Sequence, residues 1–290
     1  MEIRQIECFL ACQEHRSFTA AARSLNLVQS AVSTSVAKLE HELGARLFDR
    51  TPRGLELTDA GRAAVAPART MLRARLEITD GIDRSRGQVR GEVVVGNFMN
   101  IHTLDMASII ADLHVRYPEV TLQMRQNISG VRGNIAGLRD GSLEIALVAG
   151  MSEQIPGLTL YPISSESIVL CTAPGNPLAG RPFEAADLEG VRFIDFAPGW
   201  GIRGVADALF PGRRSVIEVA DQIFAMELAA KDFGVLLLPR SAAAVSDSIV
   251  RAERAGSPIP WHLSVAHDAR RTPSNAARTV IDALCRCRRE

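Results

Sequence analysis

The chain changes character near residue 90, and that change limits the folds open to it. Up to that point, apolar residues recur at intervals of three and four, the spacing of helices that bury one face. From Gly91 onward, short apolar runs alternate with helical stretches, which is typical of an α/β structure. At 290 residues the chain also exceeds the roughly 150 residues of one ordinary domain. We therefore predict three parts: residues 1–58, a linker helix at residues 59–88, and a larger domain at residues 89–290.

The first 58 residues predict three helices followed by a hairpin. Ser17 is suited to begin the second helix as its N-cap, and Asn26 is suited to end it. A third helix is expected over residues 28–43. In the segment FDRTPRGLELT, Pro52 and Gly54 favour a turn between two short strands. Three helices and a hairpin in this order describe a winged helix-turn-helix.

The third helix has two chemically different faces. Its apolar residues fall at spacings of four, three and four, so we expect one buried face made of Val32, Val36, Leu39 and Leu43. The opposite face carries short polar side chains and one lysine: Gln29, Ser30, Ser33, Thr34 and Lys38. Such side chains let a helix approach base edges and phosphates closely. The alternative is a polar face that merely meets solvent.

Any binding to DNA must depend on local charge, because the 33 basic and 33 acidic residues cancel. Arg50 and Arg53 stand beside the turn of the hairpin, where they are suited to bind phosphates or enter a minor groove. Two arginines on a loop can equally be solvated without a partner.

A single amphipathic helix is expected over residues 59–86. Its apolar positions run from Ala64 to Ile82 at helical spacing, with arginines on the other side. Pro67 lies inside it and should kink or weaken it. Because a long helix of this kind invites a partner helix, we expect it to form a dimer.

The larger domain predicts two α/β lobes with a crevice between them. Its expected strands are GEVVVG, VTLQMRQ, LEIALV, SIVLCTAP, FIDFAPGWG, SVIEVA and GVLLLP, and the alternation favours a mostly parallel sheet with helices on both faces. The extended segment 261–267 and a final helix from about Ser274 would return the chain to the first lobe. We expect lobe one at about residues 91–162 plus 267–290, and lobe two at about 163–266. Crevices of this kind bind small ligands.

The stretch from Ser17 to Gly61 closely resembles the signature of LysR-type transcriptional regulators. The matching landmarks are Ser17-Phe18, Ala21-Ala22, Leu25, Gln29-Ser30, Ser33, Leu39-Glu40, Leu43-Gly44, Leu47-Phe48, Arg50 and Leu57-Thr58. The resemblance extends over the whole length, but only this quarter is rich in motifs. It implies an α+β multidomain protein: a winged helix-turn-helix, a linker helix, and a bilobed α/β effector-binding domain similar to periplasmic binding proteins.

The resemblance also implies function. Such regulators form dimers through the linker helix and usually tetramers, bind and bend double-stranded operator DNA, contact RNA polymerase, and respond to a small-molecule effector lodged between the lobes. Carried over by position, the residues expected at DNA are Ser17, Thr19, Gln29, Ser30, Ser33, Thr34, Lys38, Arg50 and Arg53.

The effector site is less clear from the sequence. Asn97, Asn100 and His102 follow the first strand, where the next helix could offer free N–H groups to an anion. The other candidates are Ser129, Phe196, Trp200 and Arg203. Arg203 could pair with a carboxylate or simply hold the fold, so an organic or aromatic acid is only weakly favoured. The segment Asp232-Phe233-Gly234 departs from the family's Gly-x-Gly, which puts that wall of the site in doubt.

Other classes are disfavoured. The sequence shows no nucleophile elbow, phosphate loop or dinucleotide fingerprint, so we expect no enzyme and no cofactor. The scattered histidines predict no metal site. A solute-binding protein would not need the DNA-reading segment, and no signal peptide or membrane span is expected. Five cysteines indicate reduced thiols in a cytoplasmic protein, with a redox role for Cys8 and Cys12 left open.

Overall fold

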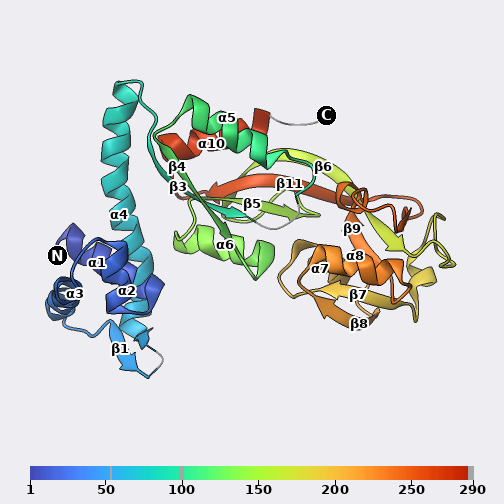
Figure 1. The fold of residues 1–290 in the computed structure, drawn as a ribbon, viewed down its shortest axis with the longest axis horizontal. Helices are drawn as coiled ribbons and strands as arrows, with labels where there is room; N and C mark the ends of the chain where they lie inside the picture. Colours follow the sequence, from blue (N-terminus) through green and yellow to red (C-terminus); the bar gives the residue numbers. More distant parts are fainter. Residues whose placement is uncertain (53, 98–100, 287–290) are drawn as a thin grey trace. The chain divides into compact units, whose positions relative to one another are not determined.

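The computed structural model describes residues 1–52, 54–97 and 101–286, apart from the side chain of residue 84. The chain divides into two compact units. The first is Met1–Gln88, to which Asp140–Ser142 are assigned, and the second is Val89–Arg139 with Leu143–Glu290. Figure 1 shows the elements of each unit.

The first unit confirms the winged helix-turn-helix. Its elements are α1 (Ile3–His15), α2 (Phe18–Ser24), α3 (Gln29–Leu43), β1 (Phe48–Thr51), β2 (Gly54–Leu57) and α4 (Asp59–Ser85). β1 and β2 form an antiparallel hairpin. Ser17 caps α2 as predicted, since its Oγ accepts a hydrogen bond from the Ala20 N–H at 3.3 Å. Asn26, just past the end of α2, adopts the left-handed backbone conformation.

The core of the first unit is built from α1, α3 and the hairpin. Val32, Val36 and Leu39 of α3 are at most 2% exposed, as their spacing predicts. The prediction for Leu43 is wrong, because this side chain is 48% exposed. Leu43 is the last residue of α3, and Gly44 then turns the chain away with a φ of +66°. The helix therefore ends before the core can cover its final apolar residue.

The linker helix α4 runs without interruption through Pro67. Ala64, Ala68 and Leu72 in its first half pack against the core of the same unit. In its second half, Ile78 is 69% exposed and Ile82 is 48% exposed, and the two lie four residues apart on one face. The apolar face expected to meet a partner helix is therefore exposed only in the second half of α4.

The second unit is organised on a seven-stranded sheet with the order β10-β6-β11-β5-β3-β4, and with β9 also paired to β6. These strands are β3 (Gly91–Asn97), β4 (Val120–Gln126), β5 (Ile145–Gly150), β6 (Leu158–Thr172), β9 (Leu236–Pro239), β10 (Val250–Ala252) and β11 (Ile259–Asp268). Within this sheet, as far as the structure describes it, only β3 with β4 and β3 with β5 are parallel pairs. The prediction of a mostly parallel sheet is wrong, because the long crossing strands β6 and β11 pair antiparallel with each other and with their neighbours.

The remaining elements complete two lobes. The helices of lobe one are α5 (Met106–Arg116), α6 (Gly130–Asp140) and α10 (Asn275–Arg286). The helices of lobe two are η1 (Ala185–Leu188), α7 (Gly201–Leu209), α8 (Gln222–Ala230) and α9 (Arg240–Ala243). Lobe two also contains the parallel pair of β7 (Arg192–Phe196) and β8 (Arg214–Val219). In Figure 1, α5 and α10 cover one face of the lobe-one sheet and α6 covers the other. β6 and β11 run through both lobes.

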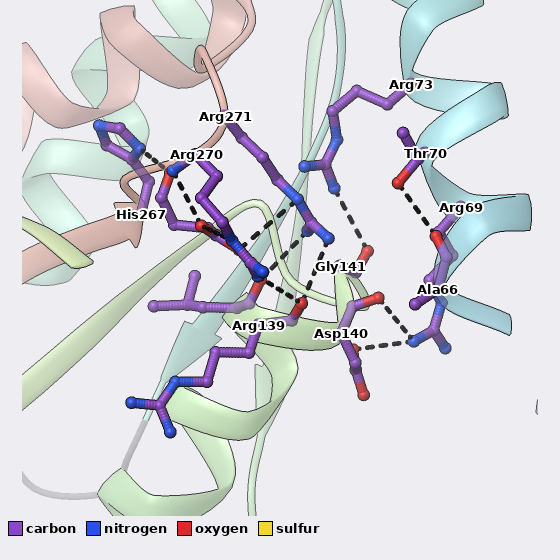
Figure 2. A network of polar contacts seen from close by, with 12 residues as sticks. Ala66, Arg69, Thr70, Arg73, Arg139, Asp140, Gly141, His267, Arg270 and Arg271 are labelled. Atoms are coloured by element: carbon purple, nitrogen blue, oxygen red, sulfur yellow. Dashed lines mark hydrogen bonds and ion pairs between the residues drawn. The ribbon is translucent and has the colours of Figure 1, made fainter. Parts of the chain in front are cut away.

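A cluster of arginines ties the end of β11 to the end of α6, as Figure 2 shows. Arg270 donates hydrogen bonds to the buried Asp268 carboxylate, at 2.7 Å from its Nη2. Arg271 donates to the main-chain oxygen of Leu138 at 3.1 Å and to that of Arg139 at 3.2 Å. The Arg270 guanidinium lowers the pKa of Asp268 below its ordinary value, so this carboxylate stays charged at neutral pH.

Candidate nucleic-acid interface and ligand cavity

The polar face of α3 lies at the surface of the first unit. Gln29, Ser30, Thr34 and Lys38 are exposed, while Ser33 is half-buried. Val32, Val36 and Leu39 anchor the opposite face in the core, so the polar residues are held outward by packing. The helix therefore presents side chains that can donate to and accept from base edges.

The structure brings several predicted residues together in one shallow groove. Ser33, Thr34 and Lys38 of α3 line it together with Arg50 of the hairpin. Arg50 is exposed, and its guanidinium carbon lies 5.3 Å from the centre of the Phe18 ring. The aromatic ring thus orients a cation beside the polar face of α3.

The remaining predicted DNA contacts are Ser17, Thr19 and Arg53. Ser17 is half-buried and occupied as the cap of α2, whereas Thr19 is exposed in the first turn of that helix. Arg53 lies outside the described residues. Its neighbour Gly54 has a φ of +110°, and a Cβ there would lie 2.6 Å from the main-chain oxygen of Arg16. That close approach docks the hairpin on the end of α1.

Two landmarks of the N-terminal segment turn out to hold the hairpin in place. Oε1 of Glu40 accepts hydrogen bonds from the N–H groups of Leu47, at 2.6 Å, and Phe48, at 3.2 Å. Oγ1 of Thr58 donates to the main-chain oxygen of Arg46 at 2.7 Å. These residues fix the angle between α3 and the wing, and spacing alone could not assign them this role.

The second unit contains a cavity between its two lobes. The residues that line it come from both lobes and from the crossing strands: Ile101, His102, Thr103, Gly130, Val131, Glu166, Phe196, Trp200, Gly201, Ile202, Gln222, Leu238, Pro239, Ser241, Ala242, Trp261 and Leu263. Phe196 and Trp200 stack with their ring centres 5.2 Å apart and their planes 5° from parallel. The wall is thus mainly apolar and aromatic, with a few polar groups.

The polar groups of the cavity are ordered by hydrogen bonds. Glu166 accepts from the Ser241 N–H at 2.7 Å and from the Ser241 hydroxyl at 2.8 Å. Nε2 of His102 lies 3.3 Å from Nε2 of Gln222, a contact between a lobe-one loop and a lobe-two helix. Burial lowers the pKa of His102, and the opposing influence of Glu166 is smaller, so the imidazole is neutral near pH 7.

Of the effector residues predicted from sequence, Phe196 and Trp200 line the cavity. Asn97, at the end of β3, is not among the lining residues, and Asn100 lies outside the described residues. Ser129 is exposed just before α6, where its N–H donates to Oδ1 of Asn127. Sequence reasoning did not select Glu166, Gln222 or Ser241, because nothing local marks isolated polar residues that only the fold brings together.

Two groups considered for anion binding have partners within the chain. Arg203 does not line the cavity; its guanidinium binds Asp207 and Glu218, each at 2.9 Å. Those contacts favour the alternative in which Arg203 holds the fold. At the helix after the first strand, the Asp105 carboxylate caps α5 and accepts from the Ser108 N–H at 3.0 Å, so this N–H is not free to bind an anion.

Three of the described thiols have the properties of structural cysteines. Cys8, Cys12 and Cys171 are fully buried. Burial raises the pKa of Cys12 and of Cys171 to about 12, and it also raises the pKa of Cys8. Redox-sensing thiols need a low pKa and access to solvent. The buried environment therefore disfavours the redox role left open for Cys8 and Cys12.

Within the described ranges, no group of three or more His, Cys, Asp or Glu side chains could hold a metal ion. A search of the same residues for a helix long and apolar enough to cross a membrane found none.

Two family models match the chain. The model described as "Bacterial regulatory helix-turn-helix protein, lysR family" matches residues 3–62. The model described as "LysR substrate binding domain" matches residues 86–287. Together they span both units.

The chain is also similar to individual proteins. It is 31% identical over 285 residues to the HTH-type transcriptional regulator TfdS of Cupriavidus pinatubonensis, covering 93% of this chain and 94% of TfdS. Full-length OxyR from Pseudomonas aeruginosa is 21% identical, covers 99% of this chain with 94% of its own length, and has a TM-score of 0.80. Full-length CbnR, solved with its target DNA, is 23% identical with a TM-score of 0.62 and covers 99% of this chain and all (100%) of its own. At these identities, the two structures show a shared fold.

Proposed function

We propose that this chain, which belongs to the LysR family of bacterial transcriptional regulators, reads its operator with the polar face of α3 and the wing, and takes its effector into the cavity between the lobes. A DNA-binding transcriptional regulator with an effector-binding domain is not an enzyme, and no reaction needs to be assigned.

One observation carries the proposal for DNA. Ser33, Thr34 and Lys38 share a groove with Arg50, so hydrogen-bonding groups and two cations face the same side of the unit. Short hydroxyl side chains let the helix backbone come close to base edges, and Gln29 at the start of α3 is suited to adenine. Lys38 and Arg50 are suited to flanking phosphates.

We further propose that two copies pair through the second half of α4. Ile78 and Ile82 lie four residues apart, on one face of α4, and are 69% and 48% exposed. A partner α4 would bury them, and the pair would place two reading helices on one duplex. Two sets of local cations then compensate for the zero net charge of each chain.

The finer assignments follow from family resemblance. We include tetramer formation and contact with RNA polymerase as expected partnerships, and we place the protein in the cytoplasm because its proposed target is chromosomal DNA. Family position makes Asn97, Asn100 and Ser129 proposed effector contacts as well, beside Phe196 and Trp200, which line the cavity.

The decisive experiment measures binding of the full-length protein to DNA fragments from upstream of its own gene and of the neighbouring genes. We expect specific binding that weakens steeply with salt. Ser33→Arg should lower the affinity for the specific DNA fragment at least about a hundredfold. The reason is that a long cationic side chain in the middle of the polar face of α3 blocks close approach to the bases.

The matched control is Ser248→Arg, which adds the same charge at an exposed position of the second unit and should bind normally. Normal operator affinity in Ser33→Arg, with an unchanged circular dichroism spectrum, would remove α3 from the groove of the DNA. A wild-type chain that binds no upstream fragment specifically would overturn the whole proposal.

A further inference from the structure

The cavity between the lobes carries a net negative formal charge. Among the described residues that line it, Glu166 is the one side chain with a formal charge at neutral pH, and none is an arginine or a lysine. His102 adds no positive charge, because burial lowers its pKa. A ligand in this cavity therefore meets a negative potential.

Nearby arginines do not change this balance. The Arg203 guanidinium is occupied by Asp207 and Glu218 and does not line the cavity. Arg240 is paired with Glu253 and donates to the Ser167 hydroxyl, and it does not line the cavity either.

Glu166 is held in position before any ligand arrives. Its Oε2 accepts from the Ser241 N–H and its Oε1 accepts from the Ser241 hydroxyl. Each carboxylate oxygen has further acceptor capacity, so both can accept from an additional donor. A preorganised carboxylate binds an ammonium group without first losing side-chain freedom.

The aromatic wall suits the same class of ligand. Phe196 and Trp200 stack closely, and Trp261 also lines the cavity. Aromatic faces attract cations and also bury the apolar body of a ligand. Nε1 of Trp200 is buried without a hydrogen-bond partner among the described residues, so an acceptor oxygen on the ligand would supply the missing bond.

At the neighbouring helix N-termini, several N–H groups that could bind an anion already donate hydrogen bonds within the chain. At α6, the Gly130 N–H donates to the Asn127 main-chain oxygen and the Arg132 N–H donates to the Gly199 main-chain oxygen. At α5, the first turn is capped by the carboxylate of Asp105. A carboxylate ligand would thus face Glu166 with no cation among the lining residues to pair with it, and burying like charges together is costly.

We propose that the effector of this regulator is an organic cation, in which an ammonium group pairs with Glu166 and an apolar, flat body lies against Phe196 and Trp200. The inference rests on the proposed function of the cavity as the effector site. It replaces the organic acid weakly favoured by the sequence, which depended on Arg203 and on a free helix N-terminus.

The test compares matched probes on the full-length protein by titration calorimetry and thermal shift. The ammonium ions are those of benzylamine, 2-phenylethylamine and tryptamine, and the acids are the carboxylates of matching ring and chain length. The neutral probe is 2-phenylethanol. We expect at least one ammonium ion to bind about tenfold or more tightly than its matched carboxylate. Glu166→Gln, which keeps the shape and an acceptor for Ser241, should weaken that ammonium ion about tenfold to a hundredfold.

Controls separate charge from folding and from the function itself. Glu166→Gln should bind 2-phenylethanol and operator DNA as the wild type does, and Glu189→Gln, at an exposed carboxylate of lobe two, should change nothing. The inference is overturned if no ammonium ion binds, if the carboxylates bind as well, or if Glu166→Gln leaves ammonium binding unchanged. In each case intact operator binding would leave the proposed function standing. Ammonium binding without any specific DNA binding would instead overturn the proposed function.

Discussion

The polar face of α3 in the first unit and the cavity of the second unit are built in opposite ways. Every residue of the groove beside α3 lies within the first 50 residues, and most are on a single helix. The cavity instead takes its walls from loops, from the four helices α6, α7, α8 and α9, and from strands that include the two crossing strands, with lining residues from Ile101 to Leu263. The first surface is a property of local periodicity, whereas the second exists only when distant segments meet.

Because of this difference, amino-acid substitutions should affect the polar face of α3 and the cavity in different ways. The polar face of α3 depends on the small core beneath it, so a substitution that disrupts this core removes the whole face. A substitution on the face itself alters only the contact made by that side chain. A cavity built from distant segments responds to changes that never touch it, because its walls depend on how those segments pack.

Gly61→Ala should disrupt the first unit and leave the cavity intact. A Cβ at this position would lie 2.1 Å from the main-chain oxygen of Leu47, which is backbone and cannot move aside cheaply. We expect a loss of about 4 kcal/mol or more from the free energy of unfolding of this unit, with loss of operator binding. Chemical denaturation followed by circular dichroism measures it. Gly81→Ala is the matched control, because nothing lies within 4 Å of its Cβ and alanine favours a helix. Equal stability of the two variants would contradict the tight contact.

Asp195→Asn should damage the cavity from outside it. Asp195 is 3% exposed and binds Nε of Arg213 at 2.8 Å, next to the cavity residue Phe196 in sequence. Removing the carboxylate leaves a buried guanidinium short of a partner, and we expect about 3 kcal/mol of destabilisation of the second unit. The exposed pair of Arg240 and Glu253 gives the control, since Glu253→Gln should cost less than about 1 kcal/mol. A similar unfolding midpoint for both variants would show that this ion pair does not support lobe two.

Arg50→Ala should weaken DNA binding without changing which sequence is preferred. A lost phosphate contact lowers the slope of log affinity against log salt by about 0.9, and we expect an affinity loss of several-fold, about 1 kcal/mol. Fluorescence anisotropy at a series of salt concentrations reports both quantities. Arg181→Ala removes an arginine of lobe two and should leave the slope as it was. An Arg50→Ala slope equal to that of the wild type would exclude a phosphate contact at this position.

The smallest expected effect is a change in melting temperature that appears only at acidic pH. Because the Arg270 hydrogen bond lowers the pKa of Asp268, the folded state holds this carboxylate charged more readily than the unfolded state. The resulting stability is fully present above the ordinary pKa of 3.8 and is lost as pH falls through the lowered value. The melting temperature of wild type should fall more steeply below pH 3.8 than that of Asp268→Asn. Asp112→Asn, at an exposed carboxylate of α5, should follow wild type; parallel curves for all three proteins would remove Asp268 from the acid response.

The same contrast explains how much could be predicted from the sequence. The winged helix, the cap at Ser17, the polar face of α3 and most strands follow from local spacing, and the structure confirms them. The mixed sheet was missed because strand direction depends on where β6 and β11 cross, which no local pattern encodes. Glu166 was missed for a related reason. It is one polar residue in a strand, and only Trp261 opposite it and Ser241 beside it make it part of a site.

The crossing strands have one more consequence. β6 and β11 pass from lobe to lobe without a break, and their pairing shifts register between Leu263 and Ser264. Glu166 and Trp261 face each other across this ladder a few residues from the irregularity, and both also line the cavity. A ligand bound there would contact both strands that connect the lobes. Because these strands are continuous, the angle between the lobes can change only as far as the strands twist. We therefore expect ligand binding to rotate one lobe relative to the other by a small angle, without a large domain closure.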